Sequence, residues 1–225
     1  MSSHCSIIKA LLPAAGWFSI LSGMYILVIF GISGCTPDIE YDGPMQTSNI
    51  DSINTKLEVL ERLLVERGLP VQELNPGLTR DEIEKKVTDL SYPFPEELYQ
   101  LYMWKNGTKE GSDLFLFRDQ QFSSLEEGIN NQAWLKLYGV SNAFPFASFE
   151  GAFYVLPAEE FAFHQNLERP VVSVFEGVEV YFYSLEHLLD TQISWMKENV
   201  FPESDSSNYE LEMPIWQRHN PGIFE

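Results

Sequence analysis

The stretch Val171-Val172-Ser173-Val174-Phe175-Glu176-Gly177-Val178-Glu179-Val180-Tyr181-Phe182-Tyr183 decides the fold of this chain. Apolar residues alternate along it on both sides of Glu176-Gly177, which is the pattern of two antiparallel strands joined by a tight glycine turn. In the second strand, Val178, Val180 and Phe182 are expected to share one face of the sheet. Glu179, Tyr181 and Tyr183 are expected to share the other face, which we predict to be partly open.

The same pattern occurs just upstream, where residues 146–149 and 152–156 flank Glu150-Gly151 and predict another hairpin. A further strand is expected at 113–117. Helical periodicity over 51–67 and after Ser184 predicts helices before and after these strands. Three more helices are expected to begin at Thr79, Pro95 and Ser123, with capping boxes at Thr79/Glu82 and Ser123/Glu126.

The segments between these elements are interpreted from their turn residues. Residues 74–78 (Leu-Asn-Pro-Gly-Leu) are predicted to form a turn, and Asn106-Gly107 is expected to close the third helix in a left-handed cap. The fourth helix is expected to bury the stripe Leu125, Ile129, Ala133 and Leu137. The order of the expected elements is helices, then a meander of strands, then a helix. This order predicts an α+β domain over 50–202, with an antiparallel sheet of four to five strands covered by helices.

The beginning of the chain carries an uncharged apolar run, Ala10–Ile32, preceded by Lys9 and followed by Ser33-Gly34-Cys35. Ile32-Ser33-Gly34-Cys35 resembles the lipobox of bacterial lipoproteins. The resemblance implies a cleaved signal at 1–34, lipid on Cys35, a tether over 35–49, and an extracytoplasmic domain held on a membrane, with an outer membrane favoured by Thr36. An uncleaved anchor is the alternative, because about 20 apolar residues also span a bilayer.

Charge limits the classes of partner. The formal net charge is −19, and removal of Lys9 with the signal leaves about −20. The chain has no basic run, so we exclude nucleic acid, whose phosphates require clustered lysine and arginine. An acidic domain suits a basic protein partner, because complementary charge speeds encounter and selects partners; the alternative is that acidity serves solubility alone. The two cysteines, Cys5 and Cys35, predict no disulfide in the mature chain.

The sequence contains no arrangement typical of catalysis or metal binding. His164, His187 and His219 stand alone, without further ligands at metal-binding spacing. No nucleophile elbow or phosphate-binding loop is present, so we expect no enzyme and no cofactor. The carboxylate pairs Glu96-Glu97 and Glu159-Glu160 leave a cell-wall glycan hydrolase as the least favoured alternative, because paired acids can cleave glycosides.

Two further expectations concern the surface of the domain. Glu176, Glu179, Tyr181 and Tyr183 form a candidate partner-binding patch, because aromatic side chains anchor many protein interfaces; the alternative is an ordinary sheet face covered by a helix. Residues 203–225 are expected to form a polar C-terminal tail that is loose over 203–208, with Trp216 and Phe224 as the residues that would dock back on the domain.

Several blocks of this sequence resemble the Smi/Knr-like SUKH superfamily. They are Leu74–Thr79, Ile83, Tyr92–Tyr102, Trp104–Gly107, the helix start at Ser124–Glu127, Trp134, the strands at 153–156 and 178–183, and the closing helix from Ser184-Leu185. The resemblance covers roughly residues 68–200. It implies an α+β fold like the one predicted above, and binding of partner proteins rather than catalysis.

Many bacterial members of that superfamily are immunity proteins that bind and neutralise toxins. The resemblance therefore implies a protein partner, with a basic toxin favoured by the charge of this chain. Many immunity members act in the cytoplasm, so the lipobox indicates interception at the envelope instead. A structural or regulatory envelope lipoprotein that recruits protein partners is the alternative function.

Overall fold

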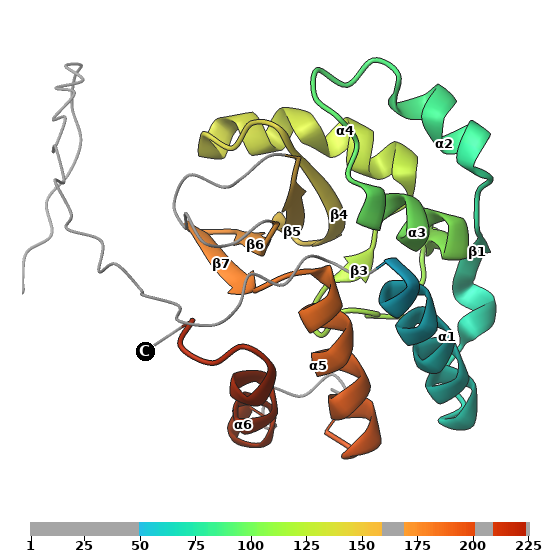
Figure 1. Cartoon of the computed structure of the whole chain (residues 1–225), viewed down its shortest axis with the longest axis vertical. Coiled ribbons are helices and arrows are strands. Elements are labelled where there is room, and N and C mark those ends of the chain that lie inside the picture. Colours follow the sequence, from blue (N-terminus) through green and yellow to red (C-terminus); the bar gives the residue numbers. More distant parts are fainter. Residues whose placement is uncertain (1–49, 159–168, 201–208, 224–225) are drawn as a thin grey trace, which may run out of the picture. The chain divides into compact units, whose positions relative to one another are not determined.

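The structure is a computed structural model and describes residues 50–158, 169–200 and 209–223 (Figure 1). A five-stranded antiparallel sheet has the order β3-β4-β5-β6-β7, and β1 and β2 form a second, two-stranded sheet. Helices surround these sheets, which confirms the predicted α+β class. The helices are α1 (Ile50–Glu66), α2 (Arg80–Val87), α3 (Glu96–Trp104), α4 (Leu125–Leu135), α5 (Leu185–Lys197) and α6 (Tyr209–His219).

The larger sheet is built from consecutive antiparallel strands, as the two predicted hairpins require. The strands are β1 (Leu74–Pro76), β2 (Lys105–Thr108), β3 (Gln121–Phe122), β4 (Ala143–Phe149), β5 (Ala152–Pro157), β6 (Val171–Val174) and β7 (Val178–Phe182). Glu150-Gly151 joins β4 to β5, with positive φ angles of 49° and 86°. Those two left-handed residues match the right-handed twist of the flanking strands.

A bulge in β7 corrects the predicted side-chain pattern. Val172 pairs with Val180, but Val171 pairs with Phe182, so Tyr181 is an extra residue in β7. An extra residue reverses the alternation of side chains beyond it. Val180 therefore packs in one hydrophobic cluster and Phe182 in another. The expectation that Val178, Val180 and Phe182 share a face is wrong at Phe182.

The main core joins one face of the sheet to helices that are far apart in the sequence. Figure 1 shows α1 and α5 side by side, and their apolar stripes (Ile53, Leu57, Leu60 and Leu64; Leu185, Leu188, Leu189, Ile193 and Met196) are buried together. At the edge of this contact, Lys56 Nζ lies 2.7 Å from an Asp190 carboxylate oxygen. A smaller cluster on the other face contains Val155, Val172, Val174 and Val180.

The small sheet corrects two predictions. It is formed by the segment predicted as a turn at 74–78 and by the segment around Asn106-Gly107, which was predicted to cap a helix. Strand β1 pairs with β2, and α3 ends at Trp104 with Lys105 already extended. Asn75 Nδ2 donates to the carbonyl oxygens of Asn106 and Thr108, at 3.2 and 3.0 Å. Gly107 has a φ of 77°, and a Cβ there would lie 2.3 Å from the Ser124 nitrogen, so only glycine fits.

Helix α4 is shifted relative to its predicted position. The capping box is Ser124/Glu127 instead of Ser123/Glu126, while the box at Thr79/Glu82 is confirmed. Ala133 and Leu137 are exposed; the close contact is made by Gly128, whose added Cβ would lie 2.5 Å from the Phe144 ring. The strand expected at 113–117 is reduced to a single bridge between Phe117 and Gln120.

The tail from Tyr209 onward is folded, with a helix that was not predicted, whereas the loose part expected at 203–208 lies outside the described residues. Helix α6 lies beside α5 in Figure 1, and it buries Ile215 and Trp216, which are 3% and 1% exposed. Trp195 Nε1 donates to the Glu212 carbonyl oxygen at 3.1 Å, and buried Asn220 Nδ2 donates to Thr191 Oγ1 at 3.1 Å. Docking of Trp216 is thus confirmed, while Phe224 lies outside the described residues.

We predict that acidification weakens the α5–α6 contact. His219 Nε2 lies 2.9 Å from Ser194 Oγ, and desolvation lowers the pKa of His219 from 6.5. A depressed pKa means that the unfolded chain binds the proton more tightly, so stability is complete above about pH 6.5 and falls as the pH drops through the folded-state pKa. The pKa values of carboxylates such as Glu96 and Glu126 are lowered from 4.5, so these groups titrate at a lower pH than that at which His219 begins to titrate.

Thermal unfolding measured at several pH values between 7.5 and 5 tests this prediction. The melting temperature of the wild type should fall across that range, and His219→Gln should reduce the slope. His187, whose pKa burial also lowers, should account for part of the slope that remains. An identical slope in the wild type and the variant would contradict the assignment.

Candidate functional site

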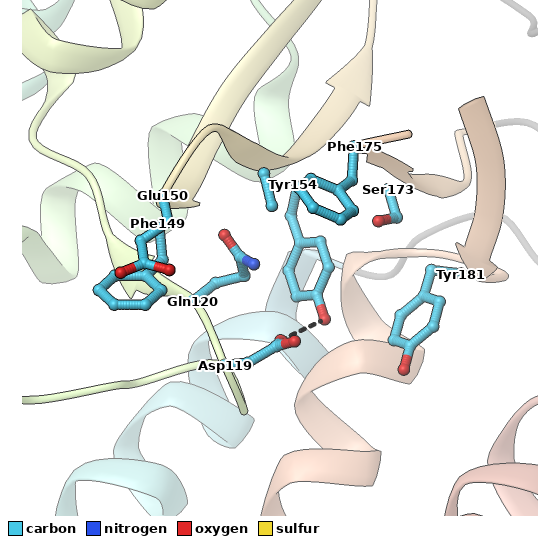
Figure 2. Close-up of a pocket in the computed structure, with 9 residues that line it drawn as sticks. Asp119, Gln120, Phe149, Glu150, Tyr154, Ser173, Phe175 and Tyr181 are labelled. Atoms are coloured by element: carbon cyan, nitrogen blue, oxygen red, sulfur yellow. Dashed lines mark hydrogen bonds between the residues drawn. The ribbon is translucent and has the colours of Figure 1, made fainter. Parts of the chain in front are cut away.

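Three turns meet around one pocket of the domain (Figure 2). They are the turn at Arg118-Asp119, the β4–β5 tip at Glu150-Gly151 and the β6–β7 tip at Phe175–Gly177. The pocket has a volume of about 280 Å³. Its lining residues are Asp119, Gln120, Phe149, Glu150, Ala152, Tyr154, Ser173, Phe175 and Tyr181.

The first turn carries Asp119 and leads into Gln120, which supply one carboxylate and the amide of the pocket. Phe117 and Gln120 exchange two backbone hydrogen bonds, of 3.1 and 2.9 Å, which closes a two-residue loop at Arg118-Asp119. Arg118 has a φ of 53°, a conformation that non-glycine residues adopt in tight turns of this type. The turn therefore fixes the backbone of Asp119 and Gln120 at the edge of the pocket.

The two hairpin tips repeat the same three residues, Phe149-Glu150-Gly151 and Phe175-Glu176-Gly177. The phenylalanine side chains remain 37% and 52% exposed, although both line the pocket. Phe149 is braced by Phe115, with ring centroids 4.7 Å apart in an edge-to-face arrangement. Each tip thus presents an exposed aromatic ring next to a carboxylate.

Two tyrosines form the inner wall of the pocket. The rings of Tyr154 and Tyr181 are stacked, with centroids 5.6 Å apart, and Tyr154 Oη donates to Asp119 Oδ1 at 3.2 Å (Figure 2). Burial raises the pKa of Tyr181 to about 12 and that of Tyr154 well above 10.0. Both hydroxyls are therefore protonated at neutral pH, and Tyr181 Oη accepts a hydrogen bond from the Arg118 guanidinium.

Arg118 contacts Tyr181, and its charge is balanced within the domain. Its Nε lies 2.9 Å from Glu212 Oε2, and its guanidinium lies 5.8 Å from the centroid of the Tyr209 ring. Burial alone would lower the pKa of Arg118. The interactions with Tyr181 and Glu212 outweigh this effect, so the pKa of Arg118 is raised. Helix α6 therefore supplies the counter-charge for a cation that holds the pocket wall.

Gln120 is the most unusual polar residue of the pocket. Its side chain is only 4% exposed, yet its Oε1 has no hydrogen-bond partner among the described residues. Figure 2 shows the amide between the Phe149–Glu150 tip and Tyr154. Most buried polar atoms in folded proteins are hydrogen-bonded, so an unpaired acceptor at a pocket calls for an explanation.

The structure brings part of the predicted patch to this pocket. Tyr181 lines it, Glu176 lies at the exposed β6–β7 tip, and Glu179 is exposed and pairs in register with the lining residue Ser173. Tyr183 lies elsewhere: it is 8% exposed, and its hydroxyl donates to the carbonyl oxygen of Pro221.

The predicted patch did not include several residues that line the pocket: Asp119, Gln120, Phe149, Glu150, Tyr154 and Phe175. The repeat of Phe-Glu-Gly at the two predicted turns could have indicated Phe149 from sequence alone, because it places a phenylalanine and a glutamate at each tip. No comparable pattern marks Asp119 or Gln120.

Other predicted groups lie apart from the pocket or outside the described residues. Glu97 is buried and paired with Arg169, and Glu96 pairs with Arg80, so this carboxylate pair supports the packing of α3. Glu159, Glu160, His164 and Cys35 fall outside the described part of the chain. Within that part, no three metal-ligating side chains converge, and no helix is long and apolar enough to cross a membrane.

No protein-family model matches the chain, and a search of curated proteins finds no significant match.

Proposed function

We propose that this chain is a membrane-anchored, non-catalytic binding protein of the SUKH type that neutralises a basic protein toxin. The pair of hairpin tips is the surface that would contact the toxin. One observation carries the proposal: both tips expose a phenylalanine beside a glutamate, around a shared pocket, on a chain with a net charge of −19.

The physical basis is the combination of apolar anchors with a charge that selects the partner. Buried aromatic side chains contribute much of the binding energy of protein interfaces. Carboxylates around them speed the encounter with a basic surface and disfavour acidic competitors. Glu150, Glu176 and Glu179 lie on or next to the tips, so the residues that attract a basic partner surround those that would be buried by it. Occlusion of the toxin surface requires no chemical step.

Charge reversal at the tips tests this surface. Because rim charges mainly affect association, Glu150→Lys/Glu176→Lys should slow binding of the partner and reduce its salt dependence. Glu58→Lys/Asp89→Lys is the matched control, because these exposed acids lie on α1 and after α2 and the net charge changes equally. Binding that is unchanged by the tip variant, or slowed equally by both variants, would contradict the proposal.

Cell survival separates neutralisation from simple recruitment. Cells that carry the wild-type protein should survive the toxin, whereas cells with the tip variant should not. Partner capture without protection against any toxin would instead support the structural or regulatory envelope lipoprotein.

Lipid attachment is tested independently of the partner. We expect labelled palmitate to enter the full-length wild-type chain and not a Cys35→Ala variant, with cleavage before Cys35 detected by mass spectrometry. Three acyl chains hold a protein firmly on a membrane, since each buried methylene contributes about 0.8 kcal/mol. An unlabelled, full-length, membrane-bound product would mean an uncleaved anchor and would overturn the lipoprotein assignment.

A further inference from the structure

We propose that the pocket between the hairpin tips receives a single arginine side chain of the protein partner. The proposal rests on the proposed function for the identity of its occupant, but it makes a separate claim about the chemistry of the pocket. Its volume of about 280 Å³ lies just below the usual range for ligand pockets, about 300–1,000 Å³, and suits one side chain better than a larger ligand.

The unpaired Gln120 Oε1 indicates a hydrogen-bond donor. This atom is buried, and no described protein group donates a hydrogen bond to it, so the protein itself leaves its acceptor capacity unused. A donor that enters the pocket with the partner would restore the missing hydrogen bond. The same atom would repel a carbonyl, a carboxylate or a phosphate, all of which present acceptors.

The carboxylates indicate that the donor is a cation. Asp119 and Glu150 both line the pocket, on opposite sides of Gln120 in Figure 2. The cation already nearby, Arg118, is paired with Glu212 at 2.9 Å and does not line the pocket. A hydrogen bond with an ionised partner is stronger than a neutral one, so the carboxylates favour a charged donor.

The aromatic walls favour a planar guanidinium over an ammonium. Phe149, Tyr154 and Phe175 place ring surfaces around the same space as the acceptors. Guanidinium stacks on aromatic faces, is less strongly hydrated than ammonium, and directs five donors outward in one plane. A guanidinium can therefore donate to Gln120 Oε1 and to a carboxylate at the same time, while its faces lie against the rings. An ammonium group has no flat face to stack on the rings.

Titration of the full-length protein with Nα-acetyl-arginine methylamide tests the proposal. The side-chain amide of Gln120 and the ring of Tyr154 should show saturable NMR shifts. The citrulline analogue has the same shape without the charge, and it should bind at least about tenfold more weakly, as expected for loss of a charged hydrogen bond. The lysine analogue should also bind more weakly than arginine.

A pair of matched variants assigns the binding to Gln120. Gln120→Met preserves the size of the side chain, removes the unpaired acceptor, and should weaken arginine binding about tenfold while leaving the fold at least as stable. Gln192→Met is the control: Gln192 is 1% exposed on α5 and also has a buried unpaired amide atom, but it does not line the pocket. This variant should bind the arginine probe like the wild type.

The outcomes separate this inference from the proposed function. Equal binding of arginine and citrulline, equal or tighter binding of lysine, or absence of saturable shifts at Gln120 would overturn the arginine pocket. If the probe fails while the tip variants still lose the partner, the proposed function survives without this pocket. If the probe binds while charge reversal at the tips leaves partner binding unchanged, the pocket chemistry stands and the proposed function fails.

Discussion

Replacement of Trp216 with alanine should lower the free energy of unfolding by about 3–5 kcal/mol, the usual cost of removing a buried tryptophan. Trp216 is 1% exposed. The centroid of its ring lies 5.7 Å from the ring centroid of Tyr181 and 6.4 Å from that of Phe182. The side chain therefore fills the contact between α6 and β7. Its loss leaves a cavity that the surrounding rings fill only in part.

Urea denaturation followed by far-UV circular dichroism measures this effect. Trp134→Ala is the matched control, because Trp134 is 58% exposed and its replacement should change stability by less than about 1 kcal/mol. Equal midpoints for the two variants would contradict the packing of α6. Since Trp216 also touches Tyr181, the Trp216 variant should loosen one wall of the pocket as well.

The largest functional effect is expected from the two exposed tip aromatics. The double variant Phe149→Ser/Phe175→Ser should reduce affinity for the partner by about 100-fold or more, because each replacement of an interface anchor costs about 2 kcal/mol and the two need not add fully. Stability should fall less than in the Trp216 variant, since both rings are partly exposed, and most of the loss should come from Phe149, which packs against Phe115.

Isothermal titration calorimetry with the purified partner checks this expectation. Val65→Ser/Leu137→Ser is the control, because these residues are 62% and 75% exposed and do not line the pocket. The control should bind like the wild type. An equal loss of affinity in both double variants would indicate a general effect of surface hydrophobicity and would count against the tips.

The elements that local sequence rules specify were predicted well. The Glu-Gly dipeptides mark both hairpins, the Thr79/Glu82 box begins α2, and the stripe from Leu185 to Met196 is buried in α5. In each of these cases, a turn, a cap or a periodicity lies within a few residues. Such patterns are visible without knowledge of the tertiary fold.

The misplaced elements depend on distant partners. Strand β1 exists because Leu74 pairs with Thr108, and α6 is buried because Trp216 reaches β7. The bulge at Tyr181 is set by the pairing of Val171 with Phe182, which no local alternation reveals. Pairings between segments far apart in the chain decide these features.

The candidate site could be predicted only in part for the same reason. Tyr181 and Glu176 were indicated by strand alternation and a turn, whereas Asp119 and Gln120 lie at a two-residue loop without a periodic pattern. Tyr183 follows the bulge and anchors the segment after α6 instead of reaching the pocket. Docking of Trp216 was expected from sequence, but the helix α6 that carries it was not.

The residues that carry the family resemblance mainly hold the fold together. Asn75 bonds to the backbone of β2, Gly107 fits closely against Ser124, and Trp104 Nε1 donates to Glu61 at 2.9 Å. None of these residues lines the pocket. These three residues therefore bear on the architecture, whereas Tyr154 and Tyr181, which fall in two other blocks that resemble the superfamily, line the pocket.

Photo-crosslinking in living cells of the producing species provides the sharpest test of the hairpin-tip surface. A photoreactive benzoylphenylalanine replaces Phe175 in the full-length chain, and a second strain carries it at Val65, which is 62% exposed on α1. We predict a covalent adduct with a basic protein at position 175, none at position 65, and loss of the adduct after Glu150→Lys/Glu176→Lys. No adduct at position 175, or the same adduct at both positions, would contradict binding through the hairpin tips.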